Sequence, residues 1–211
     1  MAEATGSHPT TGVLTKGQVD AAAAALAASH ADYPAFCHVF PDPRRRARAL
    51  APFFRATVRD AVPFGAVQAA VENREVLGVA VWLPPGTFPW SALRKARATP
   101  SFMRVLAAYP SAFGTFVSYG SNAERVPPSE RHWYLEVVGV RPGSQRQGLG
   151  TRLIQPVLDQ ADADGDPCFL ETSDRTNVPY YERFGFSVID DDLQLVPDGP
   201  THVAMRRPAR P

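Results

Sequence analysis

The spacing of apolar residues predicts an alternation of helices and strands along the chain. In the first half, Ala47, Leu50, Phe54, Val58 and Ala61 recur every three or four residues, which is the spacing of one face of an α-helix. Shorter apolar runs between polar turns predict strands instead. The elements expected in this half are a helix over residues 18–30, a helix that begins after Asp42, and a hairpin with strands at 66–71 and 76–83.

The second half of the chain alternates strand and helix more regularly. Strands are expected at 132–140, 167–172, 185–190 and 201–207, and helices at 148–163 and 177–184. This order predicts an α/β protein with a mixed sheet, whose functional turn follows the strand that ends at Val140.

Between these halves lies an aromatic segment, residues 84–131, bracketed by two proline pairs. We expect it to form one or two helices that are inserted into the fold and cover a pocket. Residues 1–12 are expected to be a flexible N-terminus and residues 13–208 a single domain.

Composition and charge narrow the class of protein. The 22 basic and 21 acidic side chains leave a net charge of +1, so no overall field favours nucleic acid or anionic lipid. Cys37 and Cys168 are far apart, which argues against a zinc site and a disulfide scaffold. The N-terminus lacks the pattern of a signal peptide, and no apolar run is long enough to cross a bilayer. We therefore expect a cytoplasmic protein with no metal, nucleic-acid or membrane partner; a homodimer is compatible with this composition.

The stretch RPGSQRQGLGTRL, residues 141–153, places glycines where a helix should begin. A P-loop would require a lysine where Leu149 stands, and a dinucleotide-binding turn would require a glycine in place of Leu153. Gln145, Gly148 and Gly150 instead fit the Q/R-x-x-G-x-G/A turn that holds the pyrophosphate of coenzyme A. Free amide hydrogens at a helix N-terminus favour such an anion, and glycine lets it approach the backbone.

A second motif follows in NVPYYERFGF, residues 177–186. Together with the glycine-rich turn, this stretch resembles the GNAT family of N-acetyltransferases over residues 132–206. The resemblance implies the GNAT fold, a mostly antiparallel mixed sheet with two splayed parallel strands and flanking helices, and acetyl-CoA as co-substrate. Segments such as FLETS (169–173) and YERFGF (181–186) also resemble the puromycin N-acetyltransferases and their actinobacterial relatives within that family.

The resemblance implies that backbone groups on the strand ending at Val140 hold the thioester arm of the coenzyme, and that Asn177 contacts the coenzyme. Gly139 within this strand is expected to allow another backbone to approach closely. The expected coenzyme-binding residues are Val138, Gly139, Val140, Gln145, Arg146, Gln147, Gly148, Leu149, Gly150, Thr151 and Asn177.

Acetyl transfer to an amine requires a base for the ammonium and an acid for the departing thiolate. Glu136 and Glu171 each lie in an otherwise apolar strand, where burial should raise the pKa of a carboxyl group towards neutrality. We favour Glu136 as the base and keep Glu171 as the alternative. For the acid, the spacing to the Gly-Phe pair of the family motif favours Tyr181 over Tyr180.

The acceptor side is expected to include Asp32 and Tyr33 of the ADYP segment, with Trp82 and Trp133 as apolar walls. Together with these residues, the family resemblance implies an acetyl-CoA-dependent N-acetyltransferase for a small amine, such as an antibiotic or aminonucleoside-like compound. Two alternatives stay open at this point, a protein or peptide N-terminal acetyltransferase and a non-catalytic acetyl-CoA sensor.

Overall fold

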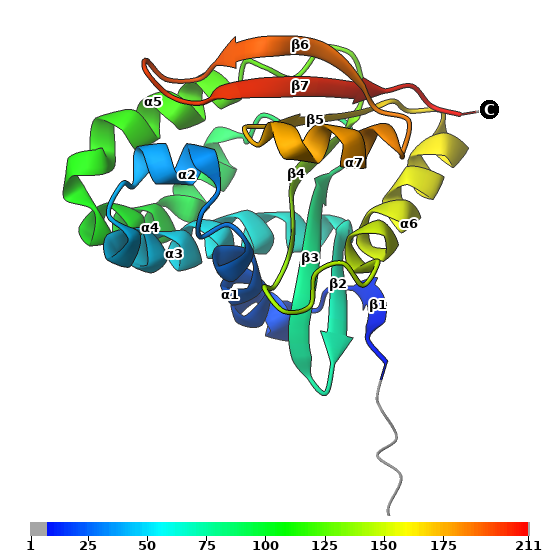
Figure 1. Ribbon diagram of the computed structural model, residues 1–211, viewed down its shortest axis with the longest axis horizontal. Coiled ribbons are helices and arrows are strands. Elements are labelled where there is room, and N and C mark those ends of the chain that lie inside the picture. Colours follow the sequence, from blue (N-terminus) through cyan, green and yellow to red (C-terminus); the bar gives the residue numbers. More distant parts are fainter. Residues whose placement is uncertain (1–7, 211) are drawn as a thin grey trace, which may run out of the picture.

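A computed structural model describes residues 8–210 and contains one sheet of seven strands with helices on both faces (Figure 1). The strands are β1 Thr10–Val13, β2 Val67–Glu72, β3 Glu75–Leu83, β4 Trp133–Val140, β5 Cys168–Thr172, β6 Ser187–Gln194 and β7 Thr201–Arg207. The helices are α1 Val19–Ser29, α2 Pro34–Val39, α3 Pro43–Ala61, α4 Ala92–Ala108, α5 Phe113–Ala123, α6 Leu149–Asp164 and α7 Val178–Glu182. Short 3-10 turns lie at Lys16–Gln18, Val62–Phe64, Pro110–Ala112 and Arg175–Asn177.

The strand order is β1-β2-β3-β4-β5-β7-β6. Every neighbouring pair is antiparallel except β4 and β5, which run parallel. This arrangement confirms the mixed, mostly antiparallel sheet that was expected. The long helices begin as their sequences predict: the Asp42 side chain, for example, accepts a hydrogen bond of 2.8 Å from the backbone of Arg45 at the start of α3.

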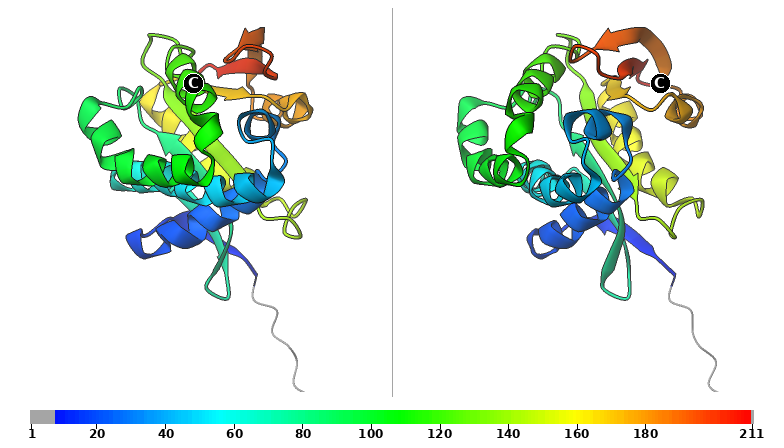
Figure 2. Two further views of the ribbon diagram at one scale, coloured as in Figure 1. Left: turned by 90° about the vertical axis from the view of Figure 1, so that its left-hand side faces the viewer. Right: turned by 60° about the vertical axis from the view of Figure 1, so that its left-hand side comes forward.

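Helices lie on the two faces of the sheet (Figure 2), and the side chains beneath them form two separate cores. On one face, α1 to α5 pack over side chains such as Val79, Val81 and Tyr134. On the other face, α6 and α7 cover side chains such as Trp82 and Leu135. Both faces are therefore buried, and the alternation along each strand decides which core a side chain enters.

The parallel strands β4 and β5 separate soon after they meet. Their register contains only the pairs Trp133 with Cys168 and Tyr134 with Phe169. Beyond Tyr134, the β5-facing edge of β4 has no paired strand among the described residues. The predicted splay of the parallel strands is therefore confirmed.

A β-bulge lies in β4 at the point where the splay begins. Val81 of β3 pairs with Val137, whereas Trp82 pairs with Leu135, so Glu136 is an extra residue with no partner in β3. Such a bulge changes the alternation of side chains along its strand. Consequently Glu136 and Val137, although adjacent, both lie on the side of α1 to α5.

The aromatic segment 84–131 forms α4 and α5, as expected. The prediction of a flexible N-terminus over residues 1–12 is wrong in part, because Thr10–Val13 form β1, which pairs antiparallel with β2. Residues 1–7, which that prediction also covered, lie outside the described residues. Within 8–210, no helix combines the length and apolarity that crossing a membrane requires.

Candidate active site

A cavity of about 900 Å³ lies between the splayed strands and the helices α1 to α5. Its floor is the open edge of β4 and the end of β5, and its cover is formed by α4 and α5. The predicted site residues that line it are Asp32, Tyr33, Glu136, Val138, Gly139, Val140, Gln145, Glu171, Asn177 and Tyr181. Most of the residues singled out on the chain are thus brought together.

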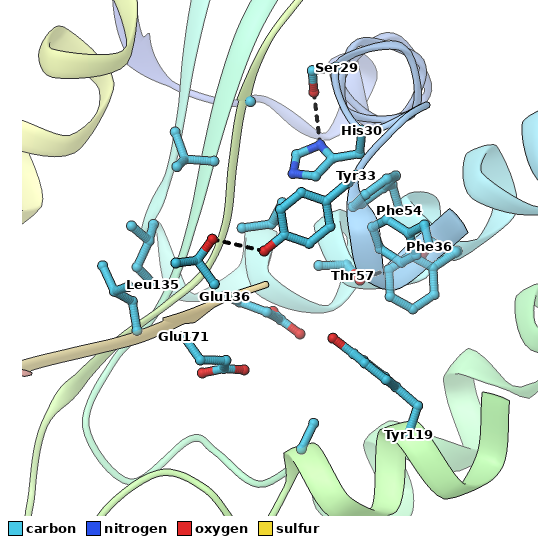
Figure 3. Close-up of a pocket in the computed structure, with 18 of the residues that line it drawn as sticks. Ser29, His30, Tyr33, Phe36, Phe54, Thr57, Tyr119, Leu135, Glu136 and Glu171 are labelled. Carbon is cyan, nitrogen blue, oxygen red and sulfur yellow. Dashed lines mark hydrogen bonds between the residues drawn. The ribbon is translucent and has the colours of Figure 1, made fainter. Parts of the chain in front are cut away.

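Glu136 and Glu171 reach the cavity from different strands (Figure 3). The bulge delivers Glu136 from β4, and the alternation after Phe169 delivers Glu171 from β5. The Oε2 atom of each carboxyl group is buried and has no hydrogen-bond partner among residues 8–210. Both groups are therefore available to a bound molecule.

Burial raises the pKa of both carboxyl groups. It raises the pKa of Glu136 to about 8, with a further contribution from the negative charge of Asp60, and it raises the pKa of Glu171 to about 7. The rise is smaller at Glu171 because the hydroxyl of Tyr134 donates a hydrogen bond of 2.5 Å to its Oε1 atom. Near neutral pH, each group is poised to exchange a proton.

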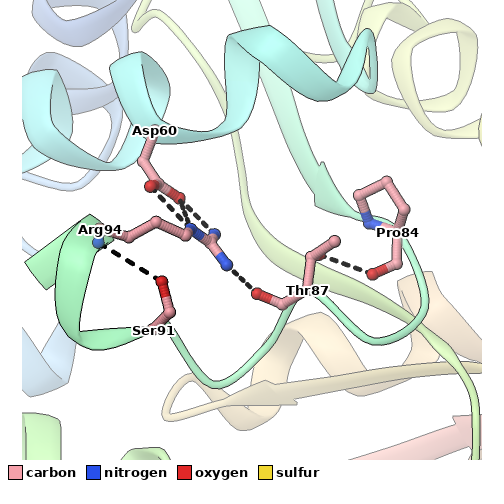
Figure 4. Close-up of polar contacts among 5 residues, drawn as sticks. All are labelled: Asp60, Pro84, Thr87, Ser91 and Arg94. Carbon is pink, nitrogen blue, oxygen red and sulfur yellow. Dashed lines mark hydrogen bonds and ion pairs between the residues drawn. The ribbon is translucent and has the colours of Figure 1, made fainter.

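A buried ion pair near Glu136 ties α3 to the start of α4 (Figure 4). The Nε atom of Arg94 donates to Oδ1 of Asp60 at 2.8 Å, and its guanidinium also donates to the backbone carbonyl of Thr87. The positive charge of Arg94 lowers the pKa of Glu136, while Asp60 raises it. The effects of Asp60 and Arg94 on the pKa of Glu136 are therefore opposite in sign and partly cancel. The ion pair also fixes the start of α4, which is part of the cover of the cavity.

Tyr181 approaches the cavity from the opposite layer. It belongs to the core beneath α6 and α7, yet it lines the cavity because the gap between β4 and β5 opens towards it. Burial raises the pKa of its phenol well above the usual value, so the hydroxyl stays protonated near neutral pH. Tyr181 therefore carries its proton near neutral pH and can offer it in a hydrogen bond to a bound molecule.

The glycine-rich turn contains three residues with left-handed backbone conformations. Gly143, Arg146 and Gly148 have positive φ angles of 89°, 61° and 74°. The side chain of Gln145 donates to the carbonyl of Val140 at 3.1 Å and closes the turn onto the strand. In the part of the chain that the structure describes, no side chain caps the N-terminus of α6, so its first amide hydrogens are free to meet an anion.

The side chains around this turn differ in access. Arg146, Gln147 and Thr151 are exposed beside it, whereas the Leu149 side chain is 2% exposed and packs in the core. Leu149 can therefore contribute to a bound coenzyme only through its backbone.

Two glycines also permit close contacts within the protein. A Cβ atom on Gly139 would lie 2.1 Å from Oγ of Ser29, so this glycine makes room for the end of α1. A Cβ atom on Gly150 would lie 2.6 Å from the hydroxyl of Tyr180. In both cases the close approach is already made within the protein.

The acceptor-side predictions need correction. Trp82 and Trp133 do not line the cavity, because their positions on β3 and β4 turn them into the core beneath α6. The Asp32 side chain is 95% exposed and lies at the rim, 3.5 Å from the guanidinium of Arg46. Tyr33 does line the cavity, but its hydroxyl accepts a hydrogen bond of 2.7 Å from the backbone of Ser173 and holds the end of β5.

Sequence reasoning missed several polar side chains of the cavity. Besides Tyr134, these include His30 and a hydrogen-bonded pair, Tyr119 and His202. Burial lowers the pKa of each histidine to about 4, so both are neutral near pH 7. Nδ1 of His202 donates to the carbonyl of Pro200, so its Nε2 atom accepts from the Tyr119 hydroxyl at 3.0 Å. The sequence motifs had marked other polar cavity residues outside the strands, namely Asp32, Tyr33, Gln145, Asn177 and Tyr181.

Among the described residues, no three histidine, cysteine, aspartate or glutamate side chains are grouped so that they could hold a metal ion.

Comparisons with known proteins agree with this geometry. The model of the acetyltransferase (GNAT) family matches residues 28–186. An uncharacterized N-acetyltransferase of Schizosaccharomyces pombe is 29% identical over 147 residues, which are 65% of this chain and 59% of that protein. The chain thus spans about three fifths of the length of this relative.

Solved structures share the fold at low sequence identity. A structure from Corynebacterium glutamicum, named for histone acetyltransferase HPA2 and related acetyltransferase, has a TM-score of 0.70 at 22% identity and covers 97% of this chain and 98% of that chain. An agmatine N-acetyltransferase mutant has a TM-score of 0.60 at 16% identity, over 94% of this chain and 98% of that chain. With the splayed strands, the glycine-rich turn and a family model that covers most of the sequence, the chain belongs to the GNAT family of acetyltransferases.

Proposed function

We propose that the protein is an acetyl-CoA-dependent N-acetyltransferase that acts on the primary amine of a small molecule. The observation that carries this proposal is the meeting of two buried carboxyl groups, each with an Oε2 atom that has no partner among the described residues, and one protonated phenol at the gap between β4 and β5. Such a set supplies both the base and the acid that acyl transfer requires.

The open edge of β4 and the uncapped N-terminus of α6 fit an elongated molecule with a diphosphate. Backbone groups of Val138, Gly139 and Val140 would pair with its amide-containing arm as an added strand would. The turn from Gln145 to Thr151 would hold the diphosphate through amide hydrogens, and Asn177 would contact the arm from the other side of the gap. Bound acetyl-CoA supplies an acetyl group activated as a thioester.

A primary alkyl amine has a pKa near that of lysine, about 10, and so arrives as an ammonium ion that must lose a proton. We assign this proton to Glu136. Its pKa of about 8 makes it a stronger base than an ordinary carboxylate, and it lies on β4 two residues before the acyl-holding segment. Glu171 is already engaged by Tyr134 and is assigned to hold the ammonium in place.

Tyr181 is assigned as the acid that protonates the departing thiolate. It stays protonated because burial raises its pKa, and it faces the gap from α7. Tyr180, its neighbour, points instead towards Gly150, where its hydroxyl fills the space of a missing Cβ.

The cover formed by α4 and α5 favours a small acceptor over a protein. Three contacts hold α5 in place: the ion pair of Lys95 and Glu124 at 2.7 Å, the Tyr119–His202 hydrogen bond, and a hydrogen bond of 2.7 Å from Asn122 to the carbonyl of Leu195. The agmatine N-acetyltransferase that shares the fold is named for a small amine. The resemblance of several segments to puromycin N-acetyltransferases supports an aminonucleoside-like acceptor.

The test is release of free coenzyme A thiol from acetyl-CoA in the presence of a panel of amines. We expect Tyr181→Phe to lower kcat by about 10²-fold or more, and Tyr180→Phe, the matched control, to retain most activity. Glu136→Gln should lose more activity than Glu171→Gln if the base is assigned correctly. Undiminished turnover in Tyr181→Phe would remove the acid assignment. Tight acetyl-CoA binding without turnover of any amine would point to a sensor.

A further inference from the structure

The half of the cavity opposite the β4–β5 gap is walled by aromatic rings. They come from α2, α3, the loop before α4, α4 itself and α5: Phe36, Phe53, Trp90, Phe102 and Phe116. Each ring is only half-buried although it packs against its neighbours. Phe116 is central, with ring centroids of Phe53 at 6.0 Å and Phe102 at 5.8 Å. The wall therefore offers uncovered apolar and aromatic surface to whatever enters.

The charged side chains of the cavity are mostly acidic. Its single lysine, Lys95, already forms an ion pair with Glu124. The two histidines are neutral near pH 7 because burial lowers their pKa values. The carboxyl groups that line the cavity are those of Asp32, Glu124, Glu136, Glu171 and Asp174. A carboxylate or phosphate on the acceptor would find no free cation among these residues and would be buried without a counter-charge, which is costly.

Within residues 8–210, the buried carboxyl groups that have an oxygen atom without a partner lie at one end of the cavity. The Oε2 atoms of Glu136 and Glu171 are both enclosed without partners at the gap (Figure 3), whereas the aromatic half contributes only the paired Glu124. One ammonium can be held at the gap, and a second at the far end would be buried without a counter-charge, which is costly. The cavity thus discriminates against diamines as well as against anionic acceptors.

We propose that the acceptor is a monoamine whose single ammonium sits between Glu136 and Glu171 and whose body is a bulky aromatic or apolar group packed against the wall around Phe116. This inference rests on the acetyltransferase function proposed above and names the substrate class of the same site. A cavity of about 900 Å³ accommodates such a molecule, since small-molecule sites span roughly 300–1,000 Å³.

The test compares amines that differ in one property each, by thiol release from acetyl-CoA. The panel is 2-phenylethylamine, agmatine, ethylamine, phenylalanine amide and phenylalanine. We expect kcat/KM to be at least about tenfold higher for 2-phenylethylamine than for agmatine or ethylamine, and at least about tenfold higher for phenylalanine amide than for phenylalanine. A preference for agmatine, or for phenylalanine over its amide, would overturn the inference and leave acetyl transfer itself intact. Absence of acetyl-CoA binding by calorimetry would overturn the proposed function and, with it, this inference.

Two phenylalanines of α5 give a matched pair of variants. Phe116 faces the cavity, whereas Phe113, three residues earlier, is 57% exposed and outside it. Phe116→Ala should lower kcat/KM for 2-phenylethylamine by about tenfold and change that for ethylamine much less, because ethylamine does not reach the wall. Phe113→Ala should change neither. The contact with the acceptor would be refuted if Phe116→Ala lowered kcat/KM equally for both amines and the conservative Phe116→Leu also affected both amines equally. That result would show that the ring only supports α5.

Discussion

The raised pKa of Glu136 predicts that removing its charge will change how the stability of the protein depends on pH. The perturbation is Glu136→Gln, which keeps the size of the side chain and removes its titration. In the folded protein the pKa is about 8, against an ordinary value of 4.5. A carboxyl group raised in this way binds its proton more tightly in the folded state, so it stabilises the fold fully below pH 4.5 and loses that contribution as the pH rises through 8.

The size of the effect follows from the shift. Between the two pKa values, wild-type stability should fall by about 1.4 kcal/mol per pH unit on account of Glu136, or roughly 4 kcal/mol from pH 5 to pH 8. For a domain of this length each kcal/mol corresponds to about 2–4 °C in Tm, so the predicted difference is on the order of 10 °C. Glu136→Gln lacks this contribution. Its amide will also lack a partner beside the buried Oε2 position, but that cost of about 1–3 kcal/mol does not vary with pH.

The assay is thermal or urea denaturation of both proteins at several pH values from 5 to 9. We expect the stability difference to move in favour of Glu136→Gln as the pH rises, whatever its value at pH 5. Glu182→Gln, an exposed position on α7, is the control and should run parallel to wild type. Parallel curves for wild type and Glu136→Gln would refute the argument that burial destabilises the charged form of Glu136.

Two further predictions concern the packing and the electrostatics of the site. Gly139→Ala should destabilise the fold by about 1–3 kcal/mol, measured by urea denaturation, because the new Cβ atom would overlap Oγ of Ser29. The control is Gly12→Ala, at a strand glycine with open space around it, which should leave the stability nearly unchanged. An equal loss of stability in both variants would contradict the overlap. Tyr134→Phe removes the hydrogen bond that lowers the pKa of Glu171, so that pKa should rise above 7. In a pH–rate profile, the increase in rate that accompanies deprotonation of Glu171 should therefore occur at a higher pH than in wild type. A shift to lower pH would contradict the role of this bond.

Local signals in the sequence were sufficient for most of the architecture. The Asp42 cap and the spacing that follows it placed α3, and the glycine-rich turn placed the start of α6. By contrast, β1 is a four-residue, mostly exposed strand, and it is held by backbone pairing with β2 that no apolar pattern records.

The site was predictable in its motifs and less so in its orientation. Trp82 was misplaced because both faces of the sheet are buried, so alternation cannot tell which face holds the cavity. The hydrogen bond from Tyr134 to Glu171 depends on the pairing of β4 with β5, which brings together residues far apart in the chain. Long-range pairing of this kind is fixed by the tertiary structure.

The extra residue in β4 constrains how this sheet can change over evolution or by design. Because side chains along a strand have a period of two, deleting Glu136 would restore the regular ladder and take the carboxyl group with it, while leaving Val137 to Val140 in register with β3. Inserting one residue after it would instead exchange inward and outward positions up to the glycine-rich turn. A one-residue change in the length of this strand therefore keeps the register only when it removes the bulge, and that change also removes the Glu136 carboxyl group, so a designer who wishes to change this group should substitute at this position and leave the residue count alone.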